Sequence, residues 1–147
     1  MDADLSHDPS RLPAMAEALK TSDLVLGSRY VAGGSVDPRW PIWRKGLSAW
    51  GNLYARSILG LKLRDMTTGF RLWRREALTA MPLDEIRSNG YVFLVEMVYV
   101  ATQLGFRLAE VPIHFEDRRF GRSKMSLAIQ LEAAARVWQV RLNRRAS

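Results

Sequence analysis

The feature that most constrains this chain is a pair of acidic residues at its start, Asp2 and Asp4. In an extended segment, side chains two positions apart leave the backbone on the same face, so both carboxylates would point the same way. Carboxylate oxygens are the ligands that Mg²⁺ and Mn²⁺ prefer, and water and nucleotide phosphates commonly complete the coordination. The pair therefore indicates half of a divalent-metal site at a strand end. Alternatively, it caps the helix that follows, because Asp-x-Asp is also frequent in loops.

The composition indicates one domain with a hydrophobic core, because 48% of the 147 residues are hydrophobic. The absence of cysteine excludes disulfides and favours a reducing compartment. The longest apolar stretch, residues 91–101, is interrupted by Glu96 and is far shorter than the ~20 residues of a membrane-spanning helix. We therefore expect no segment that crosses a bilayer.

The net charge of +7 is concentrated in two segments. Residues 39–75 contain nine Lys or Arg and one acid, and residues 118–147 contain eight and one. Basic surfaces of this kind attract the phosphate groups of nucleic acid, anionic lipid or a phosphorylated substrate. Five tryptophans and two basic amphipathic segments favour the lipid surface among these partners.

Hydrophobic periodicity and turn residues predict an alternation of helices and strands. Apolar residues every three or four positions from Trp43 to Leu61 predict a long helix, in which Arg44 and Ser48 share one stripe. Glycine and proline predict a mobile loop at 33–38. The other predicted helices cover residues 13–20, 76–81, 91–104 and 126–144, and the predicted strands cover 24–26 continuing to 30, 70–73 and 106–115.

Four short patterns follow one another along the chain. They are Asp2-x-Asp4 with Ser-His-Asp-Pro at 6–9, Gly-Ser-Arg-Tyr at 27–30, Asp-x-Thr-x-Gly-Phe-Arg at 65–71, and Phe-x-x-Arg-x-x-Gly-x-Ser-Lys at 115–124. In this order they resemble the inverting family 2 glycosyltransferases of the polyprenol-phosphate, or dolichol-phosphate, mannosyltransferase kind. The resemblance covers nearly the whole chain and implies a GT-A fold, which is a Rossmann-like α/β domain.

The resemblance also implies that the domain is incomplete at its N-terminus. In that family, strands that hold the nucleotide base and ribose precede the Asp-x-Asp motif, whereas here the motif begins at residue 2. We therefore expect residues 1–147 to be the C-terminal, acceptor-side part of one catalytic domain.

The resemblance further implies roles for individual residues. Asp2 and Asp4 would bind the metal and the donor diphosphate, and a family glutamine that helps to hold the metal is replaced here by Ser6. The implied catalytic residues are Asp4, Arg29 and Asp65, and the implied binding residues for the acceptor phosphate are Arg29, Arg44, Ser48, Arg118 and Lys124. Arginine suits this role because its planar fork of N–H donors matches phosphate oxygens.

These roles have structural alternatives. Arg44 alternatively belongs to a solvated basic face, and Arg118 and Lys124 to a surface loop. Asp65 either faces the sugar or orders its own turn.

Three further polar residues are interpreted as structural. Glu96 lies in an apolar helix, where a carboxylate needs a partner, so we expect it to pair with an arginine. His7 is interpreted as part of the entry to the first helix, and His114 as a residue on the opposite strand face from its apolar neighbours.

The resemblance implies transfer of a sugar, mannose from GDP-mannose, to a polyprenyl or dolichyl monophosphate with inversion at the anomeric carbon. Such an acceptor is already an anion near neutral pH, so its oxygen needs orientation and shielding rather than a strong general base. This agrees with a chain that is rich in arginine and contains two histidines. A bound Mg²⁺ or Mn²⁺ would neutralise charge on the departing nucleoside diphosphate.

Three alternatives stay open: a related transferase that uses another nucleotide sugar such as UDP-glucose, an inactive fragment, or a non-catalytic basic module that binds a membrane or nucleic acid. We expect no nucleic-acid partner, because no nucleic-acid-binding motif is visible and Asp-x-Asp repels phosphate without a metal. We expect a cytoplasmic protein that binds peripherally to the anionic cytoplasmic face of a membrane.

Overall fold

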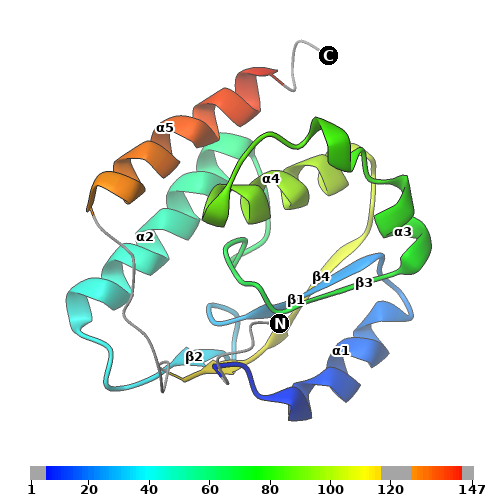
Figure 1. The fold of residues 1–147 in the computed structure, drawn as a ribbon. Coiled ribbons are helices and arrows are strands. Elements are labelled where there is room, and N and C mark those ends of the chain that lie inside the picture. Colours follow the sequence, from blue (N-terminus) through cyan, green and yellow to red (C-terminus); the bar gives the residue numbers. More distant parts are fainter. Residues whose placement is uncertain (1–5, 117–126, 144–147) are drawn as a thin grey trace.

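The computed structural model describes residues 6–116 and 127–143 (Figure 1). At its centre is a three-stranded sheet with the order β3-β1-β4. Strand β1 (Leu24–Ser28) runs parallel to β4 (Leu108–Pro112) and antiparallel to β3 (Arg71–Trp73). The α/β architecture predicted from the sequence is therefore confirmed, with a mixed sheet.

Helices cover the two faces of this sheet (Figure 1). Helix α1 (Leu12–Leu19) lies on one face, and the other face is covered by α2 (Ile42–Leu59), α4 (Gly90–Gln103) and α5 (Leu127–Asn143). The short elements are η1 (Pro9–Arg11), α3 (Arg75–Ala80), η2 (Leu83–Glu85), β2 (Ser35–Val36) and β5 (His114–Phe115).

Strand β1 divides the core because its successive side chains point to opposite faces. Val25 packs with Met15 of α1, and with Phe70 and Ile113, in one buried cluster. Leu24 and Leu26 belong to a larger cluster on the other face, which includes apolar residues of α2, α4 and α5. A continuous apolar strand of this kind is typical of a sheet that is covered on both faces.

The observed elements agree closely with the predicted ones, and the main differences concern the strands. The strand predicted over 106–115 is interrupted at Ile113, so that β4 and β5 are separate. The prediction of a mobile loop at 33–38 was wrong in part, because β2 lies within it and pairs in parallel with β5. Two paired residues on each strand are too few to produce a periodic pattern in the sequence.

No helix in the described part of the chain is long and apolar enough to cross a membrane.

Gly34 allows β2 to approach the end of β1 closely. A Cβ atom at this position would lie 2.6 Å from the backbone oxygen of Ser28 and 2.8 Å from the carbonyl group of Arg29. Both obstacles are backbone atoms, at the last residue of the central strand and the residue after it, and they cannot move aside as a flexible side chain could. The absence of a side chain at Gly34 thus fixes how the segment before α2 passes the C-terminal end of β1.

We expect Gly34→Ala to lower the free energy of unfolding by about 1–3 kcal/mol, because the new methyl group forces the backbone to shift. Gly46→Ala is the matched control, since nothing lies within 4 Å of a Cβ at this position in α2. That variant should gain about 0.5–1 kcal/mol from reduced unfolded-state entropy. Urea unfolding measures both values. Equal effects of the two substitutions would contradict the steric requirement for glycine at position 34.

Candidate active site

A buried ion pair joins the end of β1 to the turn before β3. The guanidinium of Arg29 donates from Nε to Oδ2 of Asp65 and from Nη2 to Oδ1, both at 2.7 Å. The backbone N–H of Arg29 donates to the same Oδ2 at 3.0 Å. The side chain of Asp65 is 0% exposed and that of Arg29 is 9% exposed. The two-pronged geometry is the strongest form of arginine–carboxylate contact.

The environment keeps Arg29 charged. Burial by itself lowers the pKa of the Arg29 guanidinium, but hydrogen bonds and the negative charge of Asp65 outweigh burial and raise the pKa above its ordinary value. Arg29 therefore stays charged at physiological pH, and its orientation is fixed by three hydrogen bonds to one carboxylate.

Asn52 connects this pair to α2. Its Nδ2 donates to the backbone oxygen of Ser48 at 3.2 Å and to Oγ1 of Thr67 at 3.1 Å, and its Oδ1 accepts from the backbone N–H of Met66 at 2.9 Å. Nη2 of Arg29 also donates to Oγ1 of Thr67, at 2.9 Å. The inner face of α2, the turn and the end of β1 thus form one network of buried polar groups.

Tyr30 links the residue after Arg29 to the same helix. Its hydroxyl donates to Oγ of Ser48 at 2.7 Å, and burial raises the pKa of the tyrosine, so that the hydroxyl stays protonated. Because Oγ of Ser48 acts as an acceptor from Tyr30, the hydroxyl hydrogen of Ser48 remains to be donated to another group.

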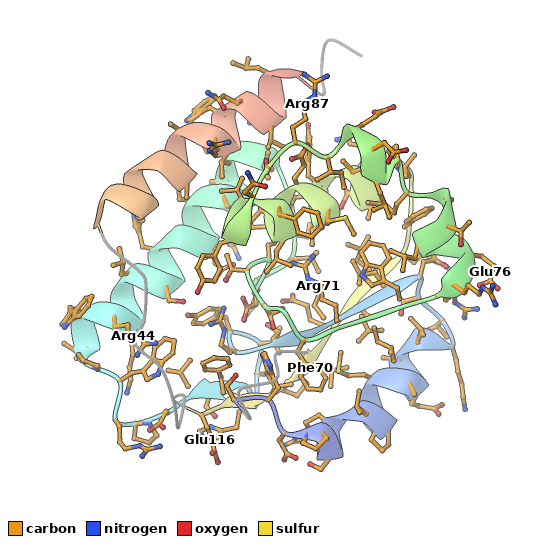
Figure 2. All side chains as sticks on the ribbon, viewed as in Figure 1. Arg44, Phe70, Arg71, Glu76, Arg87 and Glu116 are labelled. Atoms are coloured by element: carbon orange, nitrogen blue, oxygen red, sulfur yellow. The ribbon has the colours of Figure 1, made fainter. Side chains whose placement is uncertain are left out.

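Two aromatic rings separate Arg29 from Arg44. The guanidinium carbon of Arg44 lies over the ring of Trp40 at 3.9 Å, and that ring meets Phe115 edge-on with the centroids 5.6 Å apart. The guanidinium carbon of Arg29 lies 5.4 Å from the ring of Phe115. Figure 2 shows Arg44 at the N-terminal end of α2. Each arginine therefore contacts one ring of a pair of contacting rings.

The described part of the chain begins beside the same rings. His7 is buried, with its ring centroid 5.1 Å from that of Phe70 and 5.2 Å from that of Phe115. The backbone oxygen of Ser6 accepts from the N–H of Glu116 at 3.2 Å. The segment that follows Asp4 in the sequence thus reaches the end of the sheet where Arg29 and Phe115 lie.

Arg71 is a second buried arginine, which the sequence analysis quoted in a motif without giving it a role. It donates from Nε to the carbonyl of Thr68 at 2.8 Å and from Nη2 to that of Met66 at 2.6 Å, near the centre of the fold (Figure 2). Within the described residues, its buried Nη1 has no hydrogen-bond partner. Burial lowers the pKa of Arg71 to about 10, and the charge of Asp65 offsets only part of this effect.

The structure brings together four of the residues predicted to form the site, Arg29, Arg44, Ser48 and Asp65. Asp65 orders the turn, which was one of its two predicted roles. It does so by pairing with Arg29 and by accepting from Thr67. The other predicted residues, Asp2, Asp4, Arg118 and Lys124, lie outside the described residues. Over residues 6–116 and 127–143, no group of three or more His, Cys, Asp or Glu side chains could hold a metal ion.

The residues interpreted as structural are explained by local contacts. Glu96 is buried, and its carboxylate accepts from the backbone N–H of Ser88 at 3.1 Å. The sequence analysis expected an arginine as its partner and did not predict this contact. His114 is exposed, and its Nδ1 lies 2.8 Å from Oγ of Ser35, which joins β5 to β2. His7 packs between phenylalanine rings, in addition to preceding the first helix.

The polar partners in the network were missed by sequence reasoning. Tyr30, Asn52 and Thr67 fall within or next to the motifs, but nothing in their spacing indicates their mutual contacts. Glu110 was also missed: it accepts the backbone N–H groups of Arg64 and Asp65, each at 2.9 Å, and so positions the start of the turn.

Comparison with known proteins identifies the family. Residues 1–81, more than half of the chain, match the family described as Glycosyl transferase family 2. The chain belongs to this family. Its α/β architecture with a mixed sheet agrees with the GT-A fold expected for such a domain.

Two curated relatives are similar over most of the chain. The "Undecaprenyl-phosphate mannosyltransferase" of Micrococcus luteus is 50% identical over 137 residues, which are 93% of this chain and 56% of the relative. The "Polyprenol monophosphomannose synthase" of Mycolicibacterium smegmatis is 42% identical over 144 residues, which are 96% of this chain and 54% of the relative. The chain thus spans about half the length of the curated relatives it matches.

We expect Asp65→Asn to lower the free energy of unfolding by about 3–5 kcal/mol, because it leaves the buried Arg29 without its counter-charge. The control is Glu17→Gln, which breaks an exposed ion pair between Glu17 and Lys20 on α1 and should hardly change stability. Urea unfolding at neutral pH measures both. Near-equal stability of Asp65→Asn and the unmodified protein would show that the pair does not hold the site together.

Proposed function

We propose that the protein transfers mannose from GDP-mannose to a polyprenyl monophosphate, with inversion at the anomeric carbon. The observation that carries the proposal is that Arg29, just after β1, is connected to Arg44 and Ser48 of α2. Arg29 and Arg44 contact the touching rings of Phe115 and Trp40, and Tyr30 bonds to Ser48. The names of the two relatives support a polyprenyl-phosphate acceptor and a mannosyl product.

The residues of this site suit a phosphate that acts as the nucleophile. A phosphate monoester is an anion near neutral pH, so the site must orient one oxygen and reduce repulsion from the donor. Arg44 supplies a cation, and Ser48 supplies a hydroxyl hydrogen that its bond from Tyr30 leaves to be donated. Arg29 is held rigidly by Asp65, whose carboxylate neutralises its charge, so its contribution is limited to the Nη1 edge of its fork.

Asp2 and Asp4 remain the proposed metal ligands. Two carboxylates form a donor set that suits Mg²⁺ or Mn²⁺. When bound, the ion would supply charge neutralisation for the leaving nucleoside diphosphate.

We expect Arg44→Ala to lower the rate of transfer to the lipid phosphate by roughly tenfold or more, because charge-assisted hydrogen bonds to phosphate are lost. Arg44→Lys should restore only part of the rate, since a point charge does not reproduce the guanidinium fork. Arg75→Ala is the control, because Arg75 is an exposed arginine in α3, outside the site. The KM for the nucleotide sugar should hardly change.

The assay uses the complete protein with GDP-mannose and a polyprenyl monophosphate, and measures the labelled lipid product. If Arg44→Ala and Arg75→Ala lower the transfer rate equally and mildly, Arg44 has no specific role in binding the acceptor phosphate. Transfer from UDP-glucose but not from GDP-mannose would identify the related donor class instead, and absence of transfer from either donor would favour an inactive fragment.

The outer face of α2 supports the proposed binding to an anionic membrane surface. Eight positions along this face are exposed and none carries a charge: Ile42, Trp43, Gly46, Ala49, Trp50, Leu53, Ser57 and Gly60. Among them, Ile42 is 87% exposed and Trp43 is 65% exposed. This outer stripe contrasts with Arg44, Ser48 and Asn52, which lie on the opposite side of the helix. Amphipathic helices with large apolar residues and basic flanks bind in the plane of a membrane interface.

We predict that the protein binds anionic liposomes, and that binding weakens as salt rises because exposed charge attraction is screened. Replacing both Trp43 and Trp50 by serine should weaken binding at least several-fold, since their apolar surface no longer enters the interface. Leu83→Ser is the control, as Leu83 is an exposed apolar residue of η2 outside this stripe. Co-sedimentation measures the bound fraction, and unchanged binding of the double variant would exclude this face.

A further inference from the structure

Trp40 carries a buried hydrogen-bond donor that nothing in the described part of the chain accepts. The residue is 6% exposed, and its indole Nε1 is buried without a hydrogen-bond partner. An indole N–H can only donate, and a buried donor without an acceptor is unfavourable. Unpaired buried groups are rare in folded proteins, so this one calls for a physical explanation.

The position of the indole ring is fixed on several sides. The backbone N–H of Trp40 donates to the carbonyl of Asp37 at 3.1 Å, and the next residue, Pro41, begins α2 as its N-cap. One face of the ring lies under the guanidinium of Arg44, and the ring meets Phe115 at 77°. The N–H group is therefore held in one direction and is not free to turn toward another acceptor.

The groups around this indole are mostly donors. The guanidinium carbon of Arg44 lies 3.9 Å from the ring centroid, Ser48 is one helical turn further along α2, and the guanidinium carbon of Arg29 lies 5.4 Å from the ring centroid of Phe115. The indole N–H requires an acceptor, the Ser48 hydrogen remains to be donated, and Arg44 adds positive charge beside the ring. A ligand that consists of acceptor oxygens only, with negative charge, satisfies such a set, and a phosphate monoester has three terminal oxygens of this kind.

We propose that the indole N–H of Trp40 donates to a terminal oxygen of the acceptor's phosphate, beside Arg44. Trp40 would then be a phosphate-binding residue that also holds Arg44 in place through its ring. This inference rests on the proposed function, and it adds to it an uncharged hydrogen-bond donor to the phosphate.

The stacked arrangement explains why a tryptophan suits this position. The guanidinium carbon of Arg44 lies 3.9 Å from the centroid of the indole ring, so the N–H groups of both side chains are close enough to reach one ligand. Two oxygens of one phosphate can accept from the two side chains. Phenylalanine or tyrosine at position 40 could support Arg44 but would offer no N–H at the same place.

The direct test observes the indole N–H itself. The Trp40 signal in a ¹H–¹⁵N spectrum of the complete protein is assigned by its loss in Trp40→Phe, and the protein is then titrated with a short-chain polyprenyl monophosphate. We expect this signal to move downfield in proportion to binding, whereas the same polyprenol without phosphate should leave it in place. A signal that does not respond to the phosphate while other signals of the site do would overturn the proposal.

Kinetics of Trp40→Phe provide a second test, because the variant keeps a ring beside Arg44 and removes only the N–H side of the indole. The KM for the polyprenyl monophosphate should rise roughly fivefold or more, while the KM for the nucleotide sugar stays within about twofold. Trp73→Phe is the matched control, since Trp73 packs in the core of the other sheet face, away from these rings.

Stability separates the binding role from a structural role. Trp40→Phe removes an unpaired buried donor. Relative to the unmodified protein, the urea midpoint of Trp40→Phe should therefore fall by no more than the urea midpoint of Trp73→Phe. If Trp40→Phe leaves the KM for the lipid phosphate unchanged while Arg44→Ala raises it, this inference is wrong and the proposed function stands. If neither variant affects transfer to the lipid phosphate, the proposed acceptor site itself is wrong.

Discussion

The ion pair between Arg29 and Asp65 is the interaction on which the rest of the site depends. Removing two charges from water costs several kcal/mol for each ion, so such a pair persists only where further hydrogen bonds satisfy both groups. Asp65 meets this condition by accepting the N–H of Arg29, two bonds from its guanidinium and one from Thr67. The pair ties together segments that are 36 residues apart, and the position of α2 follows from it through Asn52.

The pair also determines the balance of charge at the end of the sheet. Asp65 neutralises Arg29, but the nearby Arg71 bonds only to carbonyl groups, whose dipoles stabilise a cation without cancelling its charge. Arg44 lies over an aromatic ring, whose face attracts a cation. Arg71 therefore keeps its positive charge in a largely buried environment, where charges interact more strongly than in water.

The periodic parts of the fold could be predicted from the sequence, and the site could be predicted only in part. The helix over Trp43 to Leu61 and the strand at 24–26 are encoded by local apolar patterns, which packing then reinforces. The contact of Arg29 with Asp65 depends on how distant segments meet, and no local pattern carries that information. Trp40 lies in an aperiodic loop, and the burial of its N–H depends on Phe115, which is 75 positions further along the chain. Resemblance to a family supplied the phosphate-binding candidates, but not the polar partners that orient them.

The thickness of α2 has a consequence for substrates that carry a long tail. Ser48 and Asn52 lie on one side of this helix and Trp43 and Trp50 on the other, and an α-helix with its side chains is about 10–12 Å across. Gly46 and Gly51 keep the helix slim near its middle. If the outer stripe rests on a lipid surface, a phosphate at Ser48 lies roughly one helix diameter above it. Only the first few carbon atoms of a lipid-linked substrate would then leave the bilayer. Binding at the site would therefore not depend on the length of the tail that stays in the bilayer.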